Sequence, residues 1–148
     1  MLKFFAIEGS ANNANEAINL CASALEENGC VTEDFAEDCI SREKEYPTGI
    51  PSQAPVAIPH CFTNSILDDA ICYLRLENPV TFKRMDDDAE VIQTRHVFCL
   101  ALSRKNHLDI LAKLIQRLQD EKFIDTLEHI DCYKITEFLE SNLDVEAD

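Results

Sequence analysis

A proline-rich segment in the first half of the chain restricts how this sequence can fold more than any other feature. Residues 47–59 hold one of the three glycines and four of the five prolines, Pro47, Pro51, Pro55 and Pro59. Proline has a fixed φ angle and no backbone N–H, so this spacing predicts no regular structure here. A long loop costs closure entropy and is commonly functional. We therefore expect an irregular loop that leads into residues 56–60, Val-Ala-Ile-Pro-His.

The sequence before this loop predicts one strand and two helices. Residues 2–7 are short, apolar and aromatic, as in a strand. Asparagines within residues 12–15 can cap a helix that ends at Gly29 in the left-handed conformation. Thr32 can begin a second helix, which Pro47 terminates.

The sequence after the loop predicts further strands followed by helices. The apolar runs 70–76, 80–82 and 96–102 are typical of strands. Asn106 can cap a periodic helix. Its expected buried side consists of Leu108, Leu111, Leu114, Ile115 and Leu118. Shorter helices are expected around 124–127 and 135–143. This order predicts an α/β fold over one domain, residues 1–148: a three-layer α/β/α sandwich with a small mixed β-sheet flanked by helices.

The charge of the chain excludes two classes of partner. Acidic side chains outnumber basic ones by 28 to 13, which gives a net charge of -15. Such a surface repels nucleic acid and anionic lipid headgroups. We expect protein partners with basic docking faces, steered by electrostatic attraction, unless the charge serves solubility alone. Phe62 and Ile58, close to His60, are the candidates for the apolar centre of such a contact.

Cysteine usage and hydropathy indicate a cytoplasmic protein. The chain has seven cysteines, an odd number, and no C-x-x-C pair, so reduced thiols are expected. No apolar run is long enough for a membrane span, and the N-terminus becomes acidic too early for a signal peptide.

His60 is the first candidate for a reactive side chain. It ends a strand-like run directly after the loop, where α/β proteins place reactive groups. Pro59 rigidifies the backbone immediately before the imidazole. The alternative is an ordinary exposed loop histidine, which spacing alone does not exclude.

Arg42 and His107 are candidates for holding an anion. His107 is expected in the first turn of a helix, where free N–H groups and the helix dipole attract anions. Arg42, at the end of the second helix, could add a bidentate guanidinium contact. Both could instead be solvated helix-end side chains. His96 and His129 are interpreted as structural.

Cys61 and metal chemistry are the competing interpretations. Cys61 lies beside His60, but neighbours in an extended segment point to opposite faces and make a poor nucleophile–base pair. No ligands have the spacing of a zinc cluster, and no glycine-rich phosphate loop is present. The sequence therefore predicts neither a metal nor a cofactor.

Several segments together resemble the IIA domains of the sugar phosphotransferase system, fructose/mannitol type, or EIIA type 2. The first are Arg42-Glu43, Thr48-Gly49 and the Ala-Ile-Pro-His that ends at His60. Pro-Val-Thr-Phe at 79–82 and the segment 106–111 extend the resemblance over roughly residues 10 to 130. Glu-Tyr-Pro-Thr-Gly-Ile at 45–50, Pro-His-Cys, and Ala-Ile-Cys-Tyr-Leu-Arg at 70–75 are similar to the galactitol-type branch.

The resemblance implies a cytoplasmic phosphotransferase component. His60 would become a tele-phosphohistidine, taking phosphate from the phosphocarrier protein HPr and passing it to a IIB component for uptake of a sugar or sugar alcohol. Arg42 and His107 would hold the phosphoryl oxygens. Cys61 stands where mannitol-type members have glycine, which disfavours a mannitol substrate. A regulatory module of the nitrogen type and an inert binding domain remain alternatives on the same fold.

Overall fold

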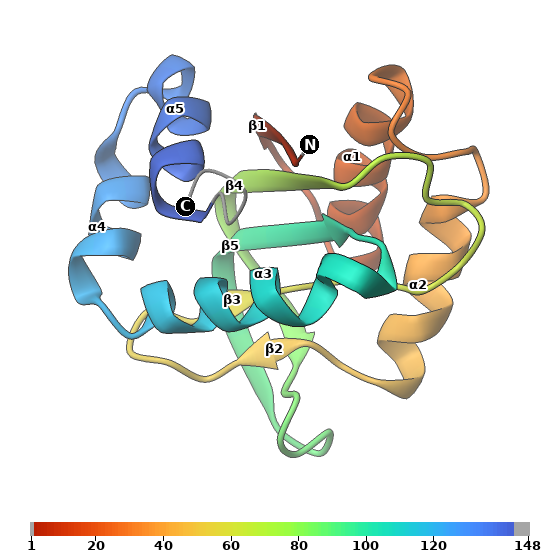
Figure 1. Ribbon diagram of the computed structural model, residues 1–148. Helices are drawn as coiled ribbons and strands as arrows, with labels where there is room; N and C mark the ends of the chain where they lie inside the picture. Colours follow the sequence, from red (N-terminus) through yellow and green to blue (C-terminus); the bar gives the residue numbers. More distant parts are fainter. Residues whose placement is uncertain (1, 144–148) are drawn as a thin grey trace.

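The computed structural model describes residues 2–143, which form five strands and five helices (Figure 1). The strands are β1 (Lys3–Gly9), β2 (Gly49–Ile50), β3 (Val56–Ala57), β4 (Ala70–Lys83) and β5 (Val91–Ala101). The helices are α1 (Ala14–Glu27), α2 (Phe35–Glu45), α3 (Arg104–Leu118), α4 (Glu121–His129) and α5 (Cys132–Leu143). No helix of the described residues has the length and apolar character that crossing a membrane requires.

The five strands form one mixed sheet in the order β1-β4-β5-β3-β2. β1 pairs with β4 in parallel, and β4 and β5 form a long antiparallel pair. β3 runs parallel to β5 and antiparallel to β2. The prediction of a small mixed β-sheet is therefore confirmed.

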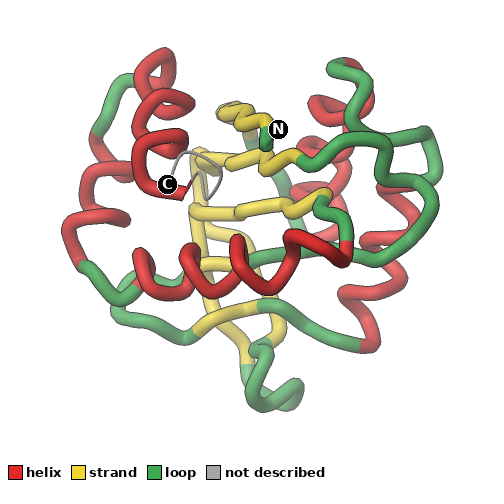
Figure 2. The backbone as a smooth tube through the Cα atoms, in the orientation of Figure 1, coloured by secondary structure: helices red, strands yellow, loops and turns green. Residues whose placement is uncertain are grey.

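Helices cover both faces of the sheet and create two separate hydrophobic cores. In Figure 1, α1 and α2 lie to the right of the sheet, and α4 and α5 lie to the left. Figure 2 shows the same layers in the backbone alone. Successive side chains of β4 alternate between the cores: Cys72 packs on the α1–α2 side, and Ile71 and Tyr73 pack on the α3–α5 side. The predicted three-layer sandwich is confirmed.

The first helix forms as its sequence predicts. The side chain of Asn13 accepts a hydrogen bond from the backbone N–H of Glu16 and so caps α1. Ile18, Cys21, Ala22 and Leu25, which recur at helical spacing, lie on its buried side. Gly29 follows with φ of 73°, the left-handed conformation that glycine adopts without strain. The second helix begins at Phe35, later than the Thr32 that was expected.

The strands depart from the sequence prediction in two places. The two predicted strands 70–76 and 80–82 form one strand, β4, with an irregularity between Arg75 and Val80. The proline-rich loop was expected to hold no regular structure, which is wrong for β2 and β3. These two-residue strands fit between the prolines, so each keeps the backbone N–H groups that its pairing requires.

The register of α3 was also predicted wrongly, and the difference matters for the site. Ser103, not Asn106, occupies the N-cap position, and the Asn106 amide donates to Asp69 instead. Leu108 is 75% exposed and Ile115 is 38% exposed, contrary to expectation. The buried residues of α3 are His107, Ile110, Leu114 and Leu118. The helix is therefore rotated so that His107 faces the sheet.

Candidate functional site

His60 lies at the carboxyl end of the short strand β3, beside β5. Ala57 pairs in parallel with Val97, and Leu100 donates from its backbone N–H to the carbonyl oxygen of Pro59 at 2.9 Å. Because β3 and β5 are parallel, their carboxyl ends meet at one edge of the sheet. The chain leaves β5 there and enters α3 at Arg104. The topology thus brings the start of α3 to the edge that carries His60.

The imidazole of His60 is held in one tautomer by its own backbone. Its Nδ1 atom lies 2.7 Å from the carbonyl oxygen of Ile58, which can only accept a hydrogen bond, so Nδ1 carries the proton. The lone pair is therefore on Nε2. Burial lowers the pKa of His60 below its ordinary 6.5, and the charge of Arg42 lowers the pKa further, against the hydrogen bond to Ile58, which raises it. At neutral pH the ring is an uncharged nucleophile.

His107 packs next to His60, although the two lie 47 positions apart in the sequence. The two imidazole centroids are 5.1 Å apart. Phe62 contacts both rings, with centroid distances of 5.8 Å to His60 and 4.6 Å to His107. His107 is only 7% exposed, because of the rotation of α3. Burial is the main cause of a lowered pKa for His107, with smaller contributions from His60 and Arg42.

Arg42 reaches this site from the last turn of α2. Its guanidinium lies 4.5 Å from the centroid of Tyr46 and 5.3 Å from that of Phe62, distances typical of cation–π contacts. Its Nε atom is buried and has no hydrogen-bond partner within residues 2–143. A buried N–H without an acceptor is costly, and an anion bound beside His60 would satisfy it.

A residue that sequence reasoning missed, Arg104, adds a second guanidinium. Arg104 is the first residue of α3, and its guanidinium carbon lies 5.5 Å from the centroid of Phe62. Neither Arg104 nor Arg42 forms an ion pair with any residue of the described chain. The available signal was a basic residue at a helix start directly after a strand, next to the segment 106–111.

A series of hydrogen bonds connects α2 to the His60 ring and explains the Arg-Glu and Thr-Gly pairs of the sequence. The Glu43 carboxylate accepts from the backbone N–H of Thr48 at 2.9 Å and from its hydroxyl at 2.8 Å. The Thr48 carbonyl accepts from the N–H of Ile58 at 3.3 Å, and the Ile58 carbonyl holds Nδ1 of His60. Burial raises the pKa of Glu43 to about 7, although the bonds from Thr48 oppose that shift.

Gly49 is required at the end of this series by a close approach of the backbone. A Cβ atom added to Gly49 would lie 2.6 Å from the carbonyl oxygen of Lys83. That oxygen belongs to the main chain and cannot move aside cheaply. The Thr-Gly pair thus serves two needs, a hydrogen-bonded threonine and a glycine beside β4.

Cys61 does not take part in the site, as expected from its position. Its side chain is 2% exposed and lies in the core beneath α1 and α2. The neighbouring Cys39 thiol and burial raise the pKa of Cys61, so it stays protonated and is a poor nucleophile.

The structure bears out the structural interpretation of His96. It is buried and bonded through Nδ1 to the Tyr73 hydroxyl at 2.6 Å and through Nε2 to Glu128 at 2.5 Å. His129 lies exposed at the end of α4. Across residues 2–143, no three histidine, cysteine or acidic side chains converge in a way that could hold a metal ion.

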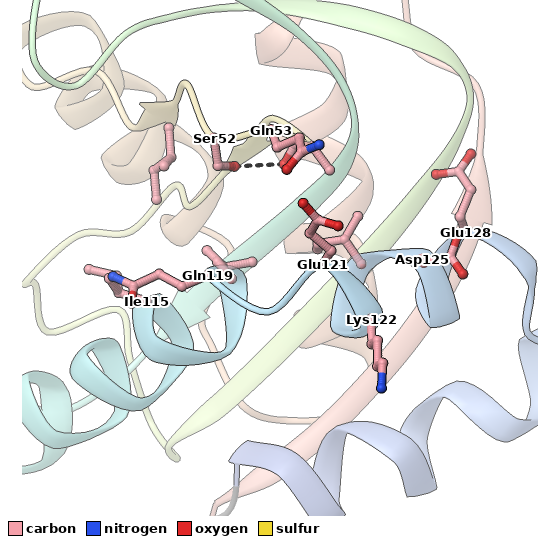
Figure 3. A pocket seen from close by; sticks show the side chains of 12 residues that line it. Ser52, Gln53, Ile115, Gln119, Glu121, Lys122, Asp125 and Glu128 are labelled. Atoms are coloured by element: carbon pink, nitrogen blue, oxygen red, sulfur yellow. Dashed lines mark hydrogen bonds between the residues drawn. The ribbon is translucent and has the colours of Figure 1, made fainter.

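A cavity of about 710 Å³ lies elsewhere, between the β2–β3 loop and the α3–α4 corner (Figure 3). In Figure 3 the side chain of Glu121 points toward the loop that carries Ser52 and Gln53, and Lys122 points away from that loop. Glu121, Asp125 and Glu128 make its lining acidic. His60, Phe62, His107, Arg42 and Arg104 are all absent from its lining, and the acidic lining would repel an anion.

The side chains around His60 suit the capture of a tetrahedral anion. They provide a neutral imidazole with a free Nε2, a second imidazole and two guanidinium groups. Charge-assisted contacts of this kind neutralise the oxygens of a transferring group while a positioned nucleophile attacks its centre.

Comparison with known sequences places the chain among transport components. Residues 3–142 match the profile of the family "Phosphoenolpyruvate-dependent sugar phosphotransferase system, EIIA 2". The galactitol-specific EIIA component of the PTS system of Escherichia coli K12 is 34% identical over 100 residues, which cover 67% of each chain. The mannitol-specific EIICBA component of the same strain is 25% identical over 122 residues, which cover 80% of this chain and 18% of that protein.

Solved structures share the same fold. IIA mannitol from Escherichia coli superposes with a TM-score of 0.73 at 24% identity, over 93% of this chain and 95% of that one. The complex of enzyme IIAMTL and phosphorylated enzyme IIBMTL from Escherichia coli gives 0.75 at 23% identity, over 95% and 99%. Nitrogen regulatory protein IIA-Ntr from Neisseria meningitidis gives 0.74 at 19% identity, over 91% and 92%.

Proposed function

The chain belongs to the EIIA type 2 family of the phosphoenolpyruvate-dependent sugar phosphotransferase system, and we propose that it is a phosphocarrier that works through Nε2 of His60. It takes phosphate from HPr and passes it to a IIB component. Residues 1–148 act as one domain in the cytoplasm. The family resemblance expected from the sequence is confirmed, including the similarity to galactitol-specific components.

The hydrogen bond between Nδ1 of His60 and the Ile58 carbonyl is the observation that carries this proposal. It leaves Nε2 as the only ring nitrogen with a free lone pair and fixes the plane of the ring. A neutral, oriented imidazole beside unpaired guanidinium groups is what acceptance of a phosphoryl group requires.

Transfer proceeds by in-line displacement at phosphorus. The Nε2 lone pair forms the new P–N bond while the bond between phosphorus and the donor breaks, and its electron pair stays on the donor. Nδ1 keeps its proton on the Ile58 carbonyl throughout. Arg42 neutralises charge on the equatorial oxygens and His107 donates a hydrogen bond to them, so no step needs a metal or a cofactor. The second transfer, to IIB, is the reverse displacement.

The substrate of the complete system is proposed from the relatives. Proteins named as galactitol-specific EIIA components are 34% identical to this chain. We infer that the chain serves uptake of a galactitol-like sugar alcohol, although IIA domains do not themselves contact the sugar.

Stepwise reconstitution tests the proposal. Purified chain is incubated with phosphoenolpyruvate, enzyme I and HPr, and the phosphorylated product is then mixed with a galactitol-type IIB. Uptake of one phosphate followed by its loss to IIB is the expected result. Uptake without onward transfer would favour a regulatory module, and no uptake would refute the proposal.

A further inference from the structure

The first turn of α3 carries charges of the sign that a helix start disfavours. The first turns of α1, α2 and α4 each contain an acidic side chain, as expected where the helix dipole is positive. The first turns of α3 and α5 contain none, and α3 begins instead with two cations, Arg104 and Lys105. In a chain with 28 acidic and only 13 basic residues, this placement opposes both the dipole and the composition.

Arg104 is held in place at the site. Its guanidinium carbon lies 5.5 Å from the centroid of Phe62, the ring that also contacts both imidazoles. Arg42 approaches the same ring at 5.3 Å from α2. Lys105, one residue further along α3, makes no cation–π contact with any ring of the described residues. Of the two cations that begin α3, Phe62 therefore contacts Arg104 alone.

Neither guanidinium group forms an ion pair with a carboxylate of residues 2–143. Both lie near one ring, so their carbons are at most roughly 11 Å apart, on the order of one Debye length in dilute salt. One carboxylate does reach this helix end, that of Asp69. It accepts hydrogen bonds from Ser103 and Asn106 and forms no ion pair with Arg104. An anion bound between the guanidinium groups would relieve their repulsion.

We propose that Arg104 is a further phosphoryl-binding residue, which contacts the phosphoryl group on the side away from Arg42 while His60 exchanges it with a partner. This inference rests on the proposed phosphocarrier function. Arg104 is exposed in the free chain, so its charge is weakened by water until a docked partner covers the site. Its contribution is therefore to the rate of transfer, not to the fold.

The test compares two cations of the same helical turn. Arg104→Ala should slow the second-order transfer from HPr on the order of ten-fold or more, as for loss of one charge-assisted contact. The matched control, Lys105→Ala, removes the same charge and should slow transfer by no more than about three-fold. The ratio between the variants should persist in about 1 M salt, where bulk attraction is screened over about 3 Å.

Two more variants separate function from folding. Arg104→Lys keeps the charge but loses the planar, bidentate group, and should recover only part of the rate. Arg104→Glu places a negative charge at the helix start, which the helix dipole favours. The melting temperature of this variant should therefore rise, or fall by no more than about 2 °C. Its transfer rate should be the lowest of the set.

The inference is overturned if Arg104→Ala and Lys105→Ala transfer equally fast, or if their difference vanishes at high salt. It is also overturned if each loss of rate follows a loss of folded protein. These outcomes require a parent chain that accepts phosphate. A parent that accepts none would instead refute the proposed function.

Discussion

Nδ1 of His60 lies 2.7 Å from the carbonyl oxygen of Ile58, two residues earlier in the chain. The carbonyl cannot donate, so the contact assigns the proton to Nδ1 and the lone pair to Nε2. Pro59, between the two residues, limits the backbone rotation that would break this contact. The reactive nitrogen is thus selected by local backbone geometry.

His60 should titrate below pH 6.5. Its folded pKa is lowered chiefly by burial and also by Arg42, so between that pKa and 6.5 the unfolded chain binds more protons. The stability that it contributes is complete above pH 6.5 and is lost as the pH falls through this range. Nitrogen-detected NMR of the imidazole measures both the midpoint and the tautomer. Arg42→Ala should move the midpoint upward, and a midpoint above 6.5 in the parent would contradict the geometry.

Glu43 should make the protein less stable as the pH rises. Its folded pKa of about 7 exceeds the ordinary 4.5, so the folded state binds the additional proton between these values. The free energy of unfolding should therefore decrease from about pH 4.5 to 7 through this group and level off above, by about 3 kcal/mol at most. Urea unfolding across this pH range measures the slope.

Two substitutions isolate that contribution. Glu43→Gln keeps hydrogen-bond partners for the N–H and the hydroxyl of Thr48, and it should abolish the decrease in the free energy of unfolding between about pH 4.5 and 7. If that decrease persists in the variant, another titratable group causes it. Glu43→Ala leaves the buried Thr48 N–H without an acceptor and should cost about 1–3 kcal/mol. It should also slow transfer, because Thr48 supports Ile58.

Arg42→Ala should slow phosphate transfer and spare the fold. Loss of one charge-assisted contact to the phosphoryl group costs on the order of ten- to a thousand-fold in rate. Its buried Nε makes no hydrogen bond in the described chain, and losing its cation–π contacts should cost only about 0.5–2 kcal/mol. Stopped-flow transfer and thermal melting measure the two effects. Lys44→Ala, in the same turn of α2, is the control; an Arg42→Ala chain that melts early and transfers normally would reverse the assignment.

Transfer from HPr should slow as salt rises. The apolar contact through Phe62 should contribute a part of the transfer rate that does not depend on salt. A chain at -15 attracts a basic docking face, and that attraction between exposed charges is screened over about 8 Å at physiological ionic strength. Ile58 was expected to share the apolar contact, but it is fully buried and does not reach the surface. We propose Leu108, which is 75% exposed and follows His107, in its place. Phe62→Ala and Leu108→Ala should each lower the rate at every salt concentration. A parent rate that is flat with salt would assign the acidity to solubility.

The sequence predicted the sheet, the layers and the position of His60 because these depend on local patterns. Alternating and continuous apolar runs mark strands, and the prolines mark where the chain must leave regular structure. The short strands β2 and β3 were missed, since two-residue strands have no periodicity and depend on pairing with β5.

The partners of His60 were predictable only in part, because they come from three distant segments. Arg42 and His107 were identified as anion-binding candidates from their expected positions at helix ends, and the family resemblance gave them their role. The burial of His107 was not predicted. The expected buried face of α3 joined Leu114 and Leu118 with Leu108, Leu111 and Ile115. Packing on the sheet buries Leu114 and Leu118 together with His107 and leaves Leu108 and Ile115 exposed. The only sequence signal for Arg104 was a basic residue at a helix start directly after a strand, and the role that we propose for it rests also on its contact with Phe62.

The most direct test of the account is to locate the phosphate and identify the nitrogen that carries it. The chain is phosphorylated with phosphoenolpyruvate, enzyme I and HPr, then examined by intact mass at alkaline pH and by phosphorus and nitrogen NMR. The account predicts one acid-labile, base-stable phosphate per chain on Nε2 of His60, and none in a folded His60→Ala variant. A full equivalent of phosphate on His60→Ala, or a phosphate on Nδ1 of His60, would contradict it.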